Sequence, residues 1–147
     1  MEIKFYTKEY EHLTKDELYE ILRLRTEVFV VEQNCIYQDI DNKDQKAIHI
    51  LGYIGTELVA YSRIFKAGDY FKKASIGRVL IAKKYRGLDF GFRLMETSIM
   101  AINIHFKEFK IAISAQEYLE KFYNRLGFIK IKESYLEDGI PHIYMIK

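Results

Sequence analysis

A glycine-containing junction between a strand and a helix is the segment of this sequence best suited to chemistry. A strand-like run, Ser75 to Ala82, leads into Arg86-Gly87-Leu88-Asp89-Phe90-Gly91, and apolar residues then recur with helical spacing. Backbone N–H groups in the first turn of a helix have no partner within it, so they can bind an anion. Arg86 would add a charge-assisted hydrogen bond, and Gly91 would let a phosphate approach the backbone. The junction predicts a phosphate site. Taken alone, the same residues would also fit an ordinary glycine-containing turn between a strand and a helix.

The elements around this junction predict one mixed α/β domain over residues 1–147. Strands are predicted at 2–6, 47–53, 58–65, 75–82 and 109–115, and two more surround the turn Glu137-Asp138-Gly139. Helices are predicted from Thr14 onward, over 88–106 and over 116–126. The first begins with capping-box spacing, Thr14 and Glu17, and the second joins two strands that should be parallel. We expect a mixed, predominantly antiparallel sheet with flanking helices.

Composition narrows the class of protein. The chain has 147 residues, 49% of them apolar, and a net charge of +2, which gives no support for a nucleic-acid partner. Its apolar stretches are shorter than the roughly 20 residues that span a membrane, and the N-terminus lacks a signal-peptide pattern. The single cysteine, Cys35, excludes an internal disulfide and a thiolate zinc cluster. We expect a cytoplasmic protein that needs no metal and no membrane.

Several segments in order resemble a known family. The junction at Arg86–Gly91 and the run Phe122-Tyr123-Asn124-Arg125-Leu126-Gly127-Phe128, with the order of elements, resemble the GNAT N-acetyltransferases over nearly the whole chain. Further segments resemble its ElaA-like branch, namely residues 24–35, 37–41, 115–116 and 137–142. The resemblance implies the GNAT acyl-CoA N-acyltransferase fold and acetyl-CoA as cofactor, with coenzyme A as product.

The resemblance also implies a cofactor groove. Its residues would be the strand segment Val79, Leu80 and Ile81, the junction residues Arg86, Gly87, Leu88, Asp89, Phe90, Gly91 and Phe92, and Gln116. The strand segment and Gln116 would bind the pantetheine arm, and the junction the pyrophosphate. Asp89 stands where the common family pattern has a glycine, a position that the ElaA-like branch also tends to fill with another residue. Gln116 could equally be a polar residue at a helix cap.

On the family's pattern, Tyr123 faces the sulfur and protonates the departing thiolate. A phenol with a pKa near 10 and a thiol near 8.5 are close enough for this transfer. The alternative is a core tyrosine in a chain that has twelve. A base must also take a proton from the amine, since only the neutral amine attacks a thioester. Glu27, Glu32 and His49 are candidates, and spacing singles out none of them.

Two charged residues, Arg25 and Glu32, fall on the apolar stripe of the first helix. They are seven residues apart, about 10.5 Å along a helix axis, so they need other partners. Asp39, Asp41 and Asp44 are available for Arg25, a structural interpretation that competes with acceptor binding. The same carboxylates would either attract a cationic acceptor or fix their loop. They do not form an EF-hand, because the fifth loop position is Lys43.

The sequence therefore predicts an acetyltransferase that moves the acetyl group of acetyl-CoA to a primary amine by direct attack in a ternary complex. The acceptor would be a small molecule or a peptide, for which the acidic loop favours a cationic amine. Two alternatives are a non-catalytic acyl-CoA sensor and an acyl-homoserine lactone synthase-like enzyme, whose early helix carries a pattern like Arg25 to Phe29. The protein would be a monomer, or a homodimer that pairs through an edge strand at 143–146.

Overall fold

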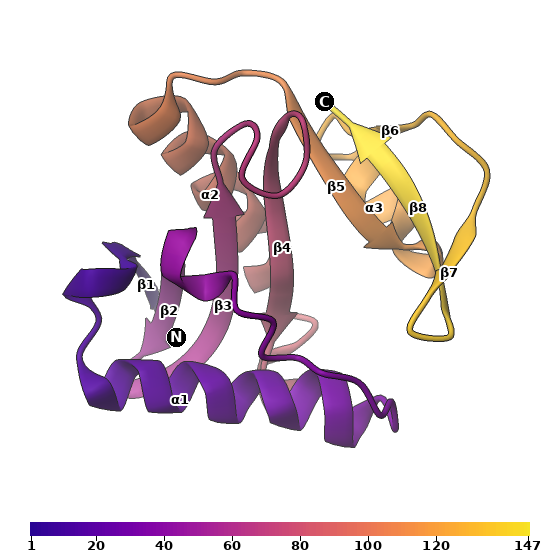
Figure 1. The fold of residues 1–147 in the computed structure, drawn as a ribbon. Helices are drawn as coiled ribbons and strands as arrows, with labels where there is room; N and C mark the ends of the chain where they lie inside the picture. Colours follow the sequence, from indigo (N-terminus) through magenta and orange to yellow (C-terminus); the bar gives the residue numbers. More distant parts are fainter.

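A strongly curved sheet of eight strands forms the centre of the molecule in a computed structural model that describes residues 1–147 (Figure 1). The strand order is β1-β2-β3-β4-β5-β8-β6, and β7 pairs with β8. The strands are β1 (Ile3–Glu9), β2 (Ile48–Ile54), β3 (Glu57–Phe65), β4 (Ala74–Ile81), β5 (Ile111–Gln116), β6 (Ile129–Lys130), β7 (Tyr135–Glu137) and β8 (Ile140–Ile146). All pairs except β4–β5 are antiparallel, which confirms the predicted fold class.

Three α-helices flank this sheet, and none of the helices has the length and apolar character needed to cross a membrane. They are α1 (Lys15–Arg25), α2 (Phe90–Phe106) and α3 (Glu120–Asn124). Helix α1 continues into a π-helical segment, η2 (Thr26–Glu32), and short 3-10 turns lie at η1 (Tyr10–His12), η3 (Asp44–Lys46), η4 (Lys83–Tyr85) and η5 (Glu117–Leu119). Helices α1 and α2 lie on opposite faces of β2–β4 in Figure 1.

The predicted capping box begins α1. The Thr14 hydroxyl accepts a hydrogen bond from the backbone N–H of Glu17 at 3.0 Å, and the Glu17 carboxylate accepts one from the backbone N–H of Thr14 at 2.8 Å. This reciprocal pair satisfies two of the N–H groups that a helix start leaves free. It fixes the direction in which α1 and η2 run along the sheet toward the end of β4 (Figure 1).

Helix α2 packs against β3 and β4 and anchors the core. Leu94, Met95 and Ile102 are fully buried on one face of α2; of the positions whose spacing predicted an amphipathic helix, Met95 and Ile102 are fully buried and Phe92, Ile99 and Phe106 partly so. One polar contact crosses this interface, between the hydroxyl groups of Ser62 on β3 and Ser98 on α2, at 2.7 Å. The N-terminus of α2 lies near the end of β4, since Gly91 is close to Ile81.

Strands β4 and β5 are parallel, as predicted, but they pair over only two positions. Ala74 pairs with Ile111 and Ser75 with Ala112, and beyond these residues the two strands diverge. A β-bulge lies in the diverging part, where Arg78 and Val79 oppose one residue of β3 and Arg78 has a φ of +51°. The divergence opens the sheet between β4 and β5.

Some predicted boundaries were wrong. Phe109 is 74% exposed and precedes β5, and Leu88 precedes α2. Gln116 ends β5 instead of beginning a helix, because it pairs with His142 on β8. The expected edge strand at 143–146 is not an edge, since β8 pairs with β5 on one side and with β6 on the other, so it cannot pair across a dimer in this way.

Candidate active site

The loop before α2 presents unused backbone donors. Gly87 and Asp89 both adopt left-handed conformations, with φ of +79° and +66°, which curl the loop around the helix N-terminus. Aspartate is a strong N-cap residue, yet the Asp89 side chain makes no capping hydrogen bond. The first N–H groups of α2, on Phe90, Gly91 and Phe92, therefore lack a side-chain cap. Such a group of donors at the positive end of a 17-residue helix suits a phosphate.

Gly91 leaves space that the protein itself does not need. A Cβ added there would have its nearest neighbours at 3.6 Å and 3.8 Å, both on the Phe122 ring, and at 3.9 Å on Ile81. These are ordinary contacts, so packing does not demand a glycine at this position. The absence of a side chain at Gly91 is compatible with the predicted close approach of a phosphate to this backbone.

The Arg86 side chain at the start of this loop already forms hydrogen bonds within the protein. Its Nε donates to the carbonyl oxygen of Ile81 at 2.9 Å, and its Nη2 donates to the Glu32 carboxylate at 3.0 Å. The hydrogen bond from Arg86 lowers the pKa of Glu32 and outweighs the opposing effect of burial. Glu32 is not on a buried stripe as predicted, because the chain changes from α- to π-helical hydrogen bonding at Thr26 and the phase of the helix changes with it.

A pocket of about 130 Å³ lies where β4 and β5 diverge. Val79 and Gln116, two of the predicted pantetheine-binding residues, line it from β4 and β5. Leu80 is buried and Ile81 half-buried on the same strand. The Gln116 side chain makes no capping hydrogen bond to the turn that follows, so its amide is available to a bound molecule. The opening therefore brings Val79 and Gln116 together, whereas Leu80, Ile81 and the predicted residues from Arg86 to Phe92 do not line this pocket.

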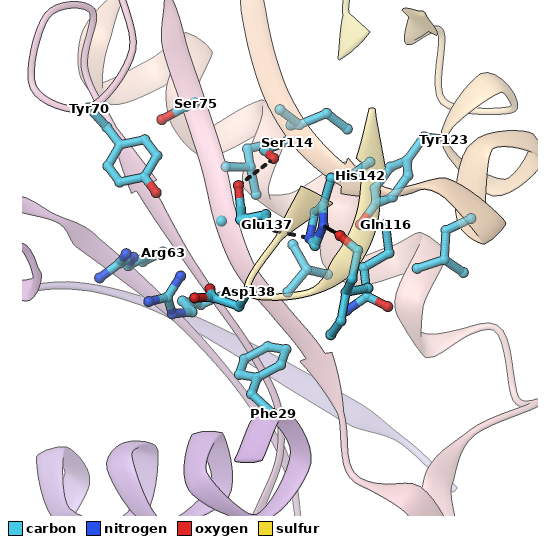
Figure 2. Close-up of a pocket in the computed structure, with 18 of the residues that line it drawn as sticks. Phe29, Arg63, Tyr70, Ser75, Ser114, Gln116, Tyr123, Glu137, Asp138 and His142 are labelled. Carbon is cyan, nitrogen blue, oxygen red and sulfur yellow. Dashed lines mark hydrogen bonds and ion pairs between the residues drawn. The ribbon is translucent and has the colours of Figure 1, made fainter. Parts of the chain in front are cut away.

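Tyr123 lies on α3 and lines the same pocket, beside Gln116 in Figure 2. Its ring packs edge-on against Phe122 and Phe128, with centroid separations of 5.0 Å and 6.2 Å. Burial raises the pKa of the Tyr123 phenol well above its usual value. The hydroxyl is therefore a neutral proton donor across the physiological pH range.

The hairpin of β7 and β8 closes the other side of the pocket with polar groups that sequence reasoning missed. Ser114, Glu137 and His142 lie together there (Figure 2), with Ser114 Oγ 2.9 Å from Glu137 Oε1 and His142 Nε2 3.5 Å from Glu137 Oε2. Cys35 Sγ lies 3.4 Å from the backbone oxygen of Asp138, which holds the hairpin turn against the chain that follows η2. The segment 137–142 is part of the ElaA-like resemblance in the sequence, and that resemblance is the signal that could have indicated these groups.

Arg25 belongs to a buried cluster of ion pairs that we call the Arg–Asp cluster, made of Arg25, Asp39, Asp41, Asp44, Arg63 and Arg78. Arg25 donates from Nε to Asp39 at 2.9 Å and from Nη1 to Asp44 at 2.7 Å. Three arginines balance three aspartates, so the cluster has no net formal charge. These carboxylates fix their loop, and the acidic loop gives no support to a cationic acceptor.

The candidate bases lie elsewhere. His49 is fully buried on β2, and Nε2 donates to the carbonyl oxygen of Asp44 at 3.0 Å while Nδ1 accepts from the Tyr61 hydroxyl at 2.6 Å. Burial lowers the pKa of His49, and neither ring nitrogen has a free lone pair. Glu27 is exposed and pairs with Arg23 at 3.3 Å. Glu27, Glu32 and His49 are not among the residues that line the pocket.

Comparison with known proteins identifies the class. Residues 9–147 match the family model described as an acetyltransferase (GNAT) domain, and the chain belongs to this family. The structure has the GNAT acyl-CoA N-acyltransferase fold. It is similar to the crystal structure of an acyl-CoA N-acyltransferase from Pseudomonas aeruginosa, with a TM-score of 0.94, 38% identity and 99% of each chain covered.

Within the family, the chain resembles the protein ElaA of Escherichia coli. The two sequences are 44% identical over 140 residues, which cover 94% of this chain and 92% of ElaA. The crystal structure of ElaA gives a TM-score of 0.93 over 99% of both chains. A CoA-dependent acyl-homoserine lactone synthase is only 14% identical, with a TM-score of 0.75 over 98% of this chain and 81% of its own, and shares the fold alone.

Proposed function

We propose that this protein transfers the acetyl group of acetyl-CoA to a primary amine, by direct attack in a ternary complex. The observation that carries this proposal is the opening between β4 and β5. Tyr123 lines the pocket in this opening, and α2 begins, without a side-chain cap, near Ile81 at the end of β4. In the proposed complex the thioester would lie near Tyr123 and the pyrophosphate near the N-terminus of α2.

Different residues along this opening would bind different parts of acetyl-CoA. The loop from Arg86 to Phe92 would hold the pyrophosphate, and Val79, Leu80, Ile81 and Gln116 would hold the pantetheine arm through backbone and amide hydrogen bonds. Acetyl-CoA supplies the activated acyl group.

Transfer to an alkylammonium ion must remove two N–H protons for each amide bond formed. One proton leaves before the nitrogen can attack, and the second leaves as the C–N bond forms and the C–S bond breaks. Tyr123 would give its phenolic proton to the departing sulfur and regain the second proton from the nitrogen. The first proton must go to another group and then to solvent.

The test is Tyr123→Phe, with Tyr19→Phe as its matched control. Tyr19 is 74% exposed on α1 and does not line the pocket, so the control removes a hydroxyl without touching the site. Thiol release from acetyl-CoA is measured with a panel of amines, and coenzyme A binding by calorimetry. Loss of a general acid should slow turnover by about 100-fold or more.

Coenzyme A affinity should change less than about threefold in Tyr123→Phe, because the ring and its packing remain. Tyr19→Phe should behave like the wild type in both measurements. Wild-type turnover in Tyr123→Phe would remove the proposed acid. Binding of coenzyme A without turnover of any amine by the wild type would favour a sensor over an enzyme.

A further inference from the structure

We propose that Glu137 and His142 form the subsite that binds the primary ammonium group of the acceptor. This inference rests on the proposed function, since it names the group that meets the acetyl donor. It starts from a segment, 137–142, that was recognised in the sequence only as a family signature. The structure folds that segment over the pocket beside Gln116 and Tyr123 (Figure 2).

A chain of hydroxyl groups fixes the Glu137 carboxylate. Ser114 Oγ lies 2.9 Å from Glu137 Oε1 and 2.6 Å from the Tyr135 hydroxyl. A carboxylate can only accept, so the single serine proton must be donated to Glu137, and Tyr135 must donate to Ser114. Burial raises the pKa of Tyr135, which keeps it a donor. This arrangement occupies Oε1 and leaves Oε2 for another partner.

His142 presents a second acceptor to the same point. Its Nδ1 lies 2.7 Å from the backbone oxygen of Ile140 and must carry a proton, because a carbonyl oxygen cannot donate. In the neutral ring the lone pair is then on Nε2, which lies 3.5 Å from Glu137 Oε2. Two acceptors thus converge on one position, where a group with several N–H donors would satisfy both. A primary ammonium has three such donors.

The sheet register places this position beside the reacting end of the acyl donor. His142 on β8 pairs directly with Gln116 at the end of β5, and Ser114 lies two residues before Gln116 on the same face. Gln116 and Tyr123 line the same pocket as Glu137 and His142. An ammonium held by Glu137 and His142 would therefore lie in the pocket that receives the thioester. His142 Nε2 would be placed to accept the first of its protons.

The rest of the pocket indicates the kind of amine. Phe29, Phe65, Tyr70 and Phe71 provide an apolar wall, so the carbon chain of the amine can be aliphatic. The arginines near this wall are neutralised by the aspartates of the Arg–Asp cluster and do not repel a cation strongly. We therefore assign the acceptor to the primary alkylammonium ions.

The test uses n-butylammonium as the probe and tetramethylammonium as its control, because the second ion has the same charge and no N–H donor. The chain has four histidines, so protein with ¹³C-labelled histidine gives few ring signals, and His142→Asn assigns the relevant one. Titrations are run at constant ionic strength, with and without coenzyme A. Glu137→Gln is compared with Glu133→Gln, an exposed glutamate four residues earlier.

We expect n-butylammonium to shift the His142 signal saturably, with an apparent Kd at least tenfold higher in Glu137→Gln and unchanged in Glu133→Gln. Tetramethylammonium should produce little shift. No response of His142 up to 100 mM n-butylammonium, equal affinity in Glu137→Gln, or an equal response to tetramethylammonium would overturn the assignment. Failure of coenzyme A to bind would instead count against the proposed function, because the titration without coenzyme A reads the ammonium subsite by itself.

Discussion

The guanidinium of Arg86 is bound by the carboxylate of Glu32, 54 residues earlier in the chain, through two hydrogen bonds. The residue expected to bind the pyrophosphate is therefore held by an anion of the protein itself. Glu32 also places a negative charge next to the loop that would receive the phosphates. Arrival of the pyrophosphate would exchange one anionic partner of Arg86 for another.

Glu32→Gln should therefore tighten coenzyme A binding. The change frees Arg86 and removes a like charge, an effect of about two- to fivefold in Kd for groups at the surface. Calorimetry at low salt measures it, and the difference should shrink as salt is added. Glu27→Gln, on the same η2 segment but paired with Arg23, is the matched control and should leave the Kd unchanged. Binding tenfold weaker in Glu32→Gln would mean that Glu32 positions Arg86 for the ligand.

Gly91→Ala should change stability and affinity in opposite directions. Alanine is favoured over glycine in a helix by up to about 1 kcal/mol, and its Cβ would make only ordinary contacts, the nearest at 3.6 Å. The free protein should melt at a higher temperature. In the proposed complex the phosphate approaches the backbone at Gly91, so the methyl group should weaken coenzyme A binding at least about tenfold. A variant that is more stable and binds normally would place the phosphate elsewhere.

Acid should weaken the Arg–Asp cluster. Burial acts to raise the pKa of Asp41, but its hydrogen bonds and ion pair with Arg63, helped by Arg78, lower it to about 2 from an ordinary 3.8. The folded pKa lies below the unfolded one, so the stabilisation is complete above pH 4 and is lost as the pH falls toward 2. Burial also acts to raise the pKa of Asp44, but the charges and hydrogen bonds of Arg25 and Arg63 together lower it.

Urea unfolding between pH 7 and pH 2.5 measures this dependence. The free energy of unfolding should fall below pH 4 in the wild type and less steeply in Asp41→Asn, which starts from a lower value at pH 7. Asp69→Asn is the control, since Asp69 lies outside the cluster. An Asp41→Asn profile parallel to that of the wild type would show that Asp41 does not contribute in this way.

Local patterns in the sequence predicted most of the fold. The capping box of Thr14 and Glu17 gave the start of α1, and the apolar spacing of residues 88–106 gave α2 to within two residues. Helix α2 could be predicted because its apolar residues, such as Met95 and Ile102, recur with helical spacing, and the structure buries both. The parallel pairing of β4 and β5 could also be predicted, because the helix between two neighbouring strands serves as the crossover that parallel strands need.

Long-range and irregular features could not be predicted in this way. The π-helical turn that brings Glu32 to Arg86 has no periodic signal, and neither has the bulge at Arg78 that helps to open the sheet. Gln116 and His142 pair across two strands that are far apart in the sequence, so no local spacing predicts this contact. These contacts decide where the carboxylates lie. The sequence therefore indicated Val79, Gln116 and Tyr123, which line one pocket, but not the polar groups of Glu137 and His142 that line it with them.

The most direct test of the central claim is the melting temperature of the protein with and without acetyl-CoA. Ligand at 100 times its Kd should stabilise the fold by about 2.7 kcal/mol, which for a chain of this size corresponds to a shift of about 5–10 °C. The shift should be much smaller in Gly91→Ala. A wild-type melting temperature unchanged by millimolar acetyl-CoA would contradict the assignment of the opening between β4 and β5 as an acyl-CoA site.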